Sequence, residues 1–174
     1  TLDDWLKTLK TEVVVEECNE ANHQRTSQLL NKTNQMNLST RRMTETELAE
    51  WNKEENHRLW TFRVSDKFGD SGLTGLISVE HNGNDIQVID FLLSCRVMGR
   101  KIEETMLHIA TEYGRSLNFK TMKAIFLETQ KNSPCHTFWK QSNFKHDEKT
   151  NTFTWDLKDP YPQPECISIV NRSG

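Results

Sequence analysis

The sequence predicts a mixed α+β domain, a twisted and partly parallel sheet flanked by helices. Three consecutive segments, 60–64, 73–79 and 86–95, have the composition of strands, and an Asn-Gly pair typical of a tight hairpin joins the last two. An apolar stripe with helical spacing then covers 102–117, and a further strand is expected at 123–128. Because a strand–helix–strand crossover places its two strands parallel, this order predicts a mixed sheet.

The other elements are predicted from local patterns. Thr44 and Glu47 form a capping-box pattern that indicates the start of a short helix. We also expect a strand at 12–16, a helix over 22–36, a helix over 133–141 and a strand at 153–157.

Three units follow from this order. Residues 1–10 are expected to form a linker helix that arrives from an upstream domain, residues 11–158 the domain itself, and residues 159–174 an extended C-terminal tail. A chain of 174 residues suits one domain of this kind.

Composition excludes several classes of protein. The formal net charge of −3 gives no broad positive field, so we expect no nucleic-acid partner. The mean hydropathy of −0.74 and the lack of a long apolar run predict no membrane span. The four cysteines and six histidines show no metal-ligand spacing, so we expect no bound metal. The scattered cysteines are expected to be free structural thiols, as is typical of a cytoplasmic protein.

The turn at 96–101 is the first candidate site. It lies between the strand at 86–95 and the striped helix, where free N–H groups at a helix start can bind phosphate. Gly99 permits close approach of a ligand to the backbone, and Arg96, Arg100 and Lys101 add positive charge. An anion site and a solvated turn remain the two interpretations.

Further candidates have two interpretations each. Asp90 is either a general base whose pKa is raised among apolar neighbours, or an Asp on the solvent side of a strand. Cys95 is either an acyl acceptor beside the turn or, as we favour, a packed thiol. Arg41 and Arg42 either bind a phosphate or carboxylate, or form an ion pair with Glu45 or Glu47.

Two sets of motifs carry a resemblance to known families. The Arg-x-x-Gly-x-Lys pattern of 96–101 resembles the pyrophosphate loop of GNAT acyltransferases, and Asn132 followed by Phe138-Trp139 and Phe144 is similar to a later GNAT segment. More specifically, the blocks 32–45, 66–73 and 94–100 resemble the C-terminal domain of FkbH-like proteins.

This resemblance implies a fold and an activity. The fold would be that of GNAT proteins, with a V-shaped opening between the strands 86–95 and 123–128. Coenzyme A or the phosphopantetheine arm of a carrier protein would lie along Phe91, Leu92 and Leu93, with its phosphates at Gly99 to Lys101 and with Arg96 and Asn132 nearby. The activity would be transfer of a glyceryl-type acyl unit to an acyl carrier protein in polyketide biosynthesis. An upstream haloacid-dehalogenase-like domain would be the second partner.

The sequence departs from the GNAT pattern at three positions. Lys101 replaces a Gly or Ala, Asn143 replaces a Gly, and Trp139 stands where many GNAT enzymes have a Tyr that protonates the leaving thiolate. An indole N–H has no acidity for that role, which favours transfer between thiols over N-acetylation. The alternatives are a non-catalytic domain that docks the carrier protein or the upstream domain, and a small-molecule N-acetyltransferase.

Overall fold

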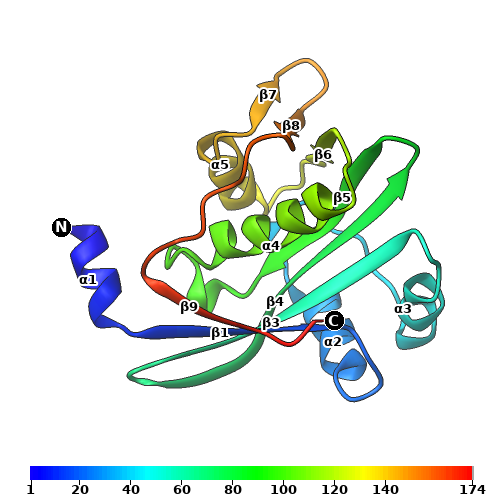
Figure 1. Ribbon diagram of the computed structural model, residues 1–174. Coiled ribbons are helices and arrows are strands. Elements are labelled where there is room, and N and C mark those ends of the chain that lie inside the picture. Colours follow the sequence, from blue (N-terminus) through cyan, green and yellow to red (C-terminus); the bar gives the residue numbers. More distant parts are fainter. Residues whose placement is uncertain (174) are drawn as a thin grey trace.

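The computed structural model describes residues 1–173 and contains one mixed sheet with helices on both faces (Figure 1). The strands follow the spatial order β7-β8-β6-β5-β4-β3-β1-β9, and β2 lies beside β5. The helices are α1 (Leu2–Thr8), α2 (His23–Lys32), α3 (Glu45–Asn52), α4 (Ile102–Ser116) and α5 (Ser133–Gln141), with a 3₁₀ turn η1 at Cys95–Val97. The strands are β1 (Thr11–Glu17), β2 (Met36–Asn37), β3 (His57–Asp66), β4 (Gly69–Asn82), β5 (Asp85–Leu93), β6 (Thr121–Ile125), β7 (Lys145–Asp147), β8 (Thr152–Asp156) and β9 (Ile167–Asn171).

The predicted meander and crossover are both present. Strands β3, β4 and β5 pair antiparallel in chain order, and β6 pairs parallel with β5 after the crossover through α4. The capping box at the start of α3 is also confirmed, since Thr44 and Glu47 exchange their side-chain and backbone hydrogen bonds. The fold class predicted from the sequence is therefore confirmed.

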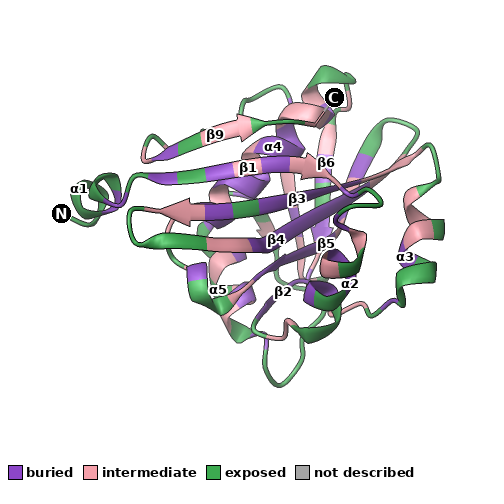
Figure 2. Cartoon of the chain, turned by 90° about the horizontal axis from the view of Figure 1, so that it is seen from below, coloured by how far each residue is buried: buried purple, intermediate pink, exposed green. Residues whose placement is uncertain are grey.

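Two apolar layers lie against the sheet, one on each face. Side chains of α4 and α5 pack with the sheet around Phe62, Phe91 and Trp139. Side chains of α2 and α3 form a smaller cluster with Leu76 and Leu92. Figure 2 shows the buried residues concentrated in the central strands and in the inner sides of the helices. No helix within residues 1–173 is long and apolar enough to cross a membrane.

The sheet divides where the family resemblance implies. In the β4–β5 ladder Ser78 pairs with Asp90 and Val79 with Val88, so β5 has one extra residue, a β-bulge, at Ile89. Strand β6 pairs with β5 only from Asp85 to Val88. Beyond that point the two strands separate, and the V-shaped opening is confirmed.

Two segments differ from the prediction. The helix expected over 22–36 ends at Lys32, and Met36 and Asn37 form the short strand β2, which pairs antiparallel with the end of β5. The tail expected to be merely extended includes β9, which pairs parallel with β1 at the edge of the sheet. The first difference matters for function, because β2 enters the opening between β5 and β6.

The core position Phe62 offers a test of this packing. Phe62 is fully buried and Phe68, in the β3–β4 turn, is 79% exposed. We expect Phe62→Ala to lower the free energy of unfolding by about 3–5 kcal/mol, because it leaves a cavity in the core. Phe68→Ala is the matched control and should change it by less than about 0.5 kcal/mol. Urea denaturation of both variants measures the difference, and equal losses would contradict the arrangement of the sheet.

Candidate functional site

The opening between β5 and β6 is filled by the protein's own chain. Met36 pairs with Leu93, and Asn37 with Leu92. Next along the chain, the Leu38 N–H donates to the Phe91 carbonyl at 3.0 Å, and the Leu38 carbonyl accepts from the Leu127 N–H at 3.0 Å. We call residues 36–38 the closing segment. It bridges the two strands and occupies the backbone groups of β5 that the resemblance assigns to a pantetheine arm.

Asn132 lies at the far side of this opening, as the resemblance implies, but its side chain is fully engaged. Its Nδ2 donates to the carbonyl oxygens of Asn37 at 3.0 Å and Leu127 at 2.9 Å. Its Oδ1 accepts from the Thr129 N–H at 2.8 Å, and the residue is fully buried. In this conformation Asn132 therefore anchors the closing segment.

Asp90 has an environment that neither interpretation predicted. It is fully buried, so it is not on the solvent side of its strand, and its carboxylate is bound by polar groups. Arg41 donates to both carboxylate oxygens, from Nε at 3.1 Å and from Nη2 at 2.5 Å, and the Ser78 hydroxyl donates at 2.6 Å. These bonds use three of about four acceptor positions of the carboxylate, and its burial keeps it away from a substrate in this conformation. The catalytic assignment of Asp90 stays a prediction, while its ion pair ties the loop after the closing segment to β5.

Arg41 is part of a stacked row of side chains. Its guanidinium carbon lies 4.7 Å from the centre of the Trp51 ring, and Trp51 stacks on His57 at 4.1 Å. His57 Nε2 is 2.8 Å from Glu80 Oε1. This row holds α3 and the loop before it against the same face of the sheet as α2. The predicted ion pair of Arg41 with Glu45 or Glu47 is therefore wrong.

Arg42 has a structural role at the end of α2. Its Nη1 donates to the Leu30 carbonyl and, at 3.0 Å, to the Thr33 carbonyl. Its Nη2 donates to Asn34 Oδ1 at 2.6 Å. These bonds satisfy carbonyl groups that a helix end leaves free, and they place positive charge at the negative end of the helix dipole. An ion pair of Arg42 with either glutamate is likewise wrong.

The turn at 96–101 has the backbone form of a ligand loop but carries internal partners. Gly99 has a φ of +76°, a conformation that favours glycine, and its N–H donates to Glu103 Oε2 at 2.9 Å. Arg100 pairs with Asp66 at 2.8 Å, and Lys101 with Glu104 at 3.2 Å. The Gly99 N–H and the side chains of Arg100 and Lys101 are thus bound to carboxylates of the protein.

Glu103 is a buried carboxyl group in the first turn of α4. It is 4% exposed, and its Oε1 has no hydrogen-bond partner among residues 1–173. Burial raises the pKa of Glu103, and the hydrogen bond from the Gly99 N–H opposes that rise. A buried carboxylate at this position would repel the phosphates of coenzyme A.

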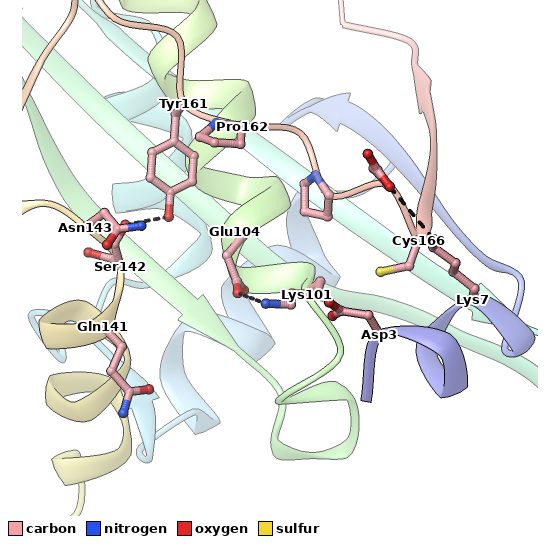
Figure 3. A pocket seen from close by; sticks show the side chains of 12 residues that line it. Asp3, Lys7, Lys101, Glu104, Gln141, Ser142, Asn143, Tyr161, Pro162 and Cys166 are labelled. Carbon is pink, nitrogen blue, oxygen red and sulfur yellow. Dashed lines mark hydrogen bonds and ion pairs between the residues drawn. The ribbon is translucent and has the colours of Figure 1, made fainter. Parts of the chain in front are cut away.

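A cavity of about 360 Å³ lies beside the start of α4, between α1, the end of α5 and the C-terminal segment (Figure 3). Its lining contains two ammonium groups, Lys7 and Lys101, and three carboxyl groups, Asp3, Glu104 and Glu165. Figure 3 shows the pair Lys101–Glu104, whose charged atoms are 3.2 Å apart. Lys7 pairs with Glu165 at 3.8 Å. This balance of charge does not suit a diphosphate.

The cysteines and Trp139 complete the site. Cys95 is exposed in η1, so the packed thiol that we favoured for it is wrong. Trp139 is fully buried against Phe91, and its Nε1 has no hydrogen-bond partner in the described part of the chain. Its ring thus fills the space under β5 and offers no acidic proton. No cluster of three or more His, Cys, Asp or Glu side chains within residues 1–173 could hold a metal ion.

Together these contacts decide whether a pantetheine arm fits. In this conformation it does not, because the closing segment holds the edge of β5, and the Glu103 carboxylate holds the Gly99 N–H. Of the residues predicted from the resemblance, Phe91 to Leu93 and Asn132 contact the closing segment, whereas Gly99 to Lys101 lie in the turn before α4. Their roles toward a ligand stay predictions.

Glu103 gives this site a testable pH dependence. Since its pKa is raised in the folded protein, its contribution to stability is present below the unfolded-state pKa of about 4.3 and is lost as pH rises through the folded-state pKa. Glu103→Gln keeps an acceptor for the Gly99 N–H and removes the buried charge. We expect this variant to be more stable than the wild type at pH 7 and equally stable near pH 4. Urea denaturation at both pH values measures this, and a wild type that is more stable at pH 7 would contradict it.

The comparisons with known proteins bear on the fold. No family model and no curated protein matches the sequence. Solved structures do match. A GNAT-family acetyltransferase from Staphylococcus aureus has a TM-score of 0.62 at 9% identity, covering 83% of this chain and 99% of its own. A spermidine N-acetyltransferase from Vibrio cholerae, solved with CoA and spermine, has a TM-score of 0.56 at 14% identity, covering 78% and 82%. A domain from Methanocaldococcus jannaschii has a TM-score of 0.63 at 12% identity, covering 84% and 99%. At these identities the likeness establishes the fold: the chain has the GNAT fold, as its sequence predicts.

Proposed function

We propose that this chain is a GNAT-fold acyltransferase domain that acts on an acyl group carried by phosphopantetheine, and that its groove opens when the closing segment withdraws. The observation that carries the proposal is the opening itself. Strands β5 and β6 separate after Val88 and Ala124, and the freed edge of β5 is bound only by a short peptide. That edge presents backbone N–H and C=O groups that can pair with an extended chain carrying amide groups.

The closing segment and a pantetheine arm offer β5 the same kind of group. Both have amides that can donate to and accept from the backbone of residues 91–93. Replacing one amide partner by another leaves the number of hydrogen bonds unchanged, so it changes the free energy little. Replacement of the closing segment by a pantetheine arm therefore costs little free energy in hydrogen bonds. The free-energy cost of withdrawing the segment is determined by its apolar side chains.

Those side chains favour the closed state. Met36 is 3% exposed and Leu38 is fully buried, and exposing a side chain of this kind costs about 1.5–3 kcal/mol. A ligand shifts such an equilibrium only by its difference in affinity for the two states. A carrier protein supplies contact area in addition to its phosphopantetheine arm, whereas free coenzyme A supplies its nucleotide, which the carboxylates at the start of α4 repel. This difference supports a carrier protein as the partner.

A second function is favoured by the same contacts. A non-catalytic domain that docks a carrier protein, or an upstream domain, would have no need of an open groove. The Glu103 carboxylate on the Gly99 N–H and the lack of an acidic proton on Trp139 support this second function. A small-molecule N-acetyltransferase is compatible with the fold, but it would need a proton donor that Trp139 does not supply.

Asn132→Ser tests the proposed function. The serine is too short to reach both carbonyl oxygens that Asn132 binds, so it weakens the attachment of the closing segment. We expect the variant to bind a holo carrier protein several-fold more tightly than the wild type does. Calorimetry measures both affinities, and acetyl-CoA is titrated as a second ligand for comparison. Asn56→Ser is the matched control, because Asn56 also donates to a carbonyl oxygen, that of His81, but far from the groove.

The outcomes separate the two functions. Binding of holo carrier protein that exceeds binding of the apo form, and that rises in Asn132→Ser, supports the transferase. Equal binding of apo and holo forms by both proteins would favour the docking domain and contradict the proposal. Amide hydrogen exchange at Leu38 and Leu127, whose N–H groups bond across the closing segment, should rise in the variant and shows that the segment has loosened.

A further inference from the structure

A second cavity, of about 390 Å³, shares no lining residue with the cavity of Figure 3. It is formed by α2, the chain that leads into β2, and the residues that follow β5; these elements are neighbours in Figure 2. The lining residues are Arg25, Leu29, Lys32, Thr33, Asn34, Gln35, Met36, Leu93, Ser94, Cys95 and Arg96. Its volume lies in the range of small-molecule sites, about 300–1,000 Å³.

The charge of this cavity is of one sign. Arg25, Lys32 and Arg96 line it, and no Asp or Glu does. None of the three forms an ion pair with any residue that the structure describes, whereas Arg58, Arg100 and Arg115 each pair with a carboxylate. Uncompensated positive charge in a hollow is unexpected in a chain with a net charge of −3, and it creates a local field that attracts anions.

The cations are placed by regular structure. Arg25, Leu29 and Lys32 are spaced four and three residues apart on α2, so they share one face of the helix. Arg96 projects from η1 and is held by contacts of 3.4 Å with Ser94 Oγ and with the Ser71 carbonyl. These contacts use two of its five N–H groups, and guanidinium groups bind phosphate oxygens in pairs. Arg96 thus serves this cavity rather than the start of α4.

The remaining lining indicates the shape of the ligand. Leu29, Met36 and Leu93 are buried apolar residues, and they form part of the wall. Asn34 and Gln35 add amide groups. We propose that this cavity binds the phosphate group of a small phosphorylated molecule, with Arg25, Lys32 and Arg96 around the phosphate and the short organic part against the apolar wall. Binding here does not require the groove between β5 and β6 to open.

Cys95 provides a reporter for the test. It lines the cavity and is exposed, whereas Cys18 and Cys135 are buried. Burial raises the pKa of Cys18 to about 11 and raises that of Cys135 further, so neither forms a thiolate readily at neutral pH. In a Cys166→Ser background, the rate of alkylation by iodoacetamide, an uncharged reagent, therefore reports on Cys95. We would measure this rate with glycerol 3-phosphate, inorganic phosphate or glycerol, at constant ionic strength set with sodium chloride.

We expect glycerol 3-phosphate to slow alkylation several-fold in a saturable manner, and glycerol to have no effect. If inorganic phosphate protects as well as glycerol 3-phosphate, the phosphate group alone is sufficient for binding. If inorganic phosphate protects less, the organic part of the ligand contributes. Both outcomes support the site. The variant Arg25→Gln/Lys32→Gln should lose protection, while Lys53→Gln/Lys123→Gln, which changes the charge equally elsewhere, should keep it. An unchanged circular-dichroism spectrum shows that each variant is folded, and protection is taken as the ratio of rates with and without ligand for the same variant, because the removed cations can alter the rate itself. Absence of protection in the wild type, or equal protection in both double variants, would overturn the proposal.

Discussion

The structure depends on one constraint, the need to satisfy the backbone of β5 and β6 where these strands separate. Unpaired N–H and C=O groups in a buried position cost free energy, and such groups arise where β5 and β6 stop pairing after Val88 and Ala124. The closing segment supplies hydrogen-bond partners for the edge of β5 on one side and for the Leu127 N–H on the other. Asn132 and the Arg41–Asp90 pair hold this segment at its two flanks. The environments of most candidate residues follow from this single arrangement.

Elements that depend on local patterns could be predicted from the sequence. The meander follows from period-two segments and tight turns, α4 from its apolar stripe, and α3 from its capping box. The opening between β5 and β6 required the family resemblance, because no local pattern encodes it. Strand β2 was missed, since two residues that follow a helix carry too weak a signal. The only local signal for β2 was the alternation of apolar Met36, polar Asn37 and apolar Leu38. It was overlooked because the predicted helix over 22–36 already included Met36.

For the candidate site, the sequence predicted the places of the residues in the fold better than their hydrogen-bond and ion-pair partners. Asp90 lies on β5, Gly99 in the turn between β5 and α4, and Asn132 at the start of α5, because the order of strands and helices places them there. Their partners come from distant parts of the chain: 49 residues separate Arg41 from Asp90, and 95 separate Asn37 from Asn132. Charge pairs and hydrogen bonds over such separations leave no local pattern in a single sequence. The Glu103–Gly99 contact is local, but a glutamate in the first turn of a helix is ordinarily a favourable exposed charge, so its burial was not foreseen.

The groove and the basic cavity share a stretch of chain, and this links the two proposals physically. Residues 33–36 line the basic cavity, and residues 36–38 close the groove, with Met36 in both. A phosphorylated ligand that contacts Gln35 and Met36 in their closed positions would bind less tightly once the segment withdraws, so its presence favours the closed groove. By linkage, a pantetheine arm in the groove would weaken the affinity of the cavity by the same factor. The two sites would then be occupied in alternation, and the closing segment would be the element that both ligands bias.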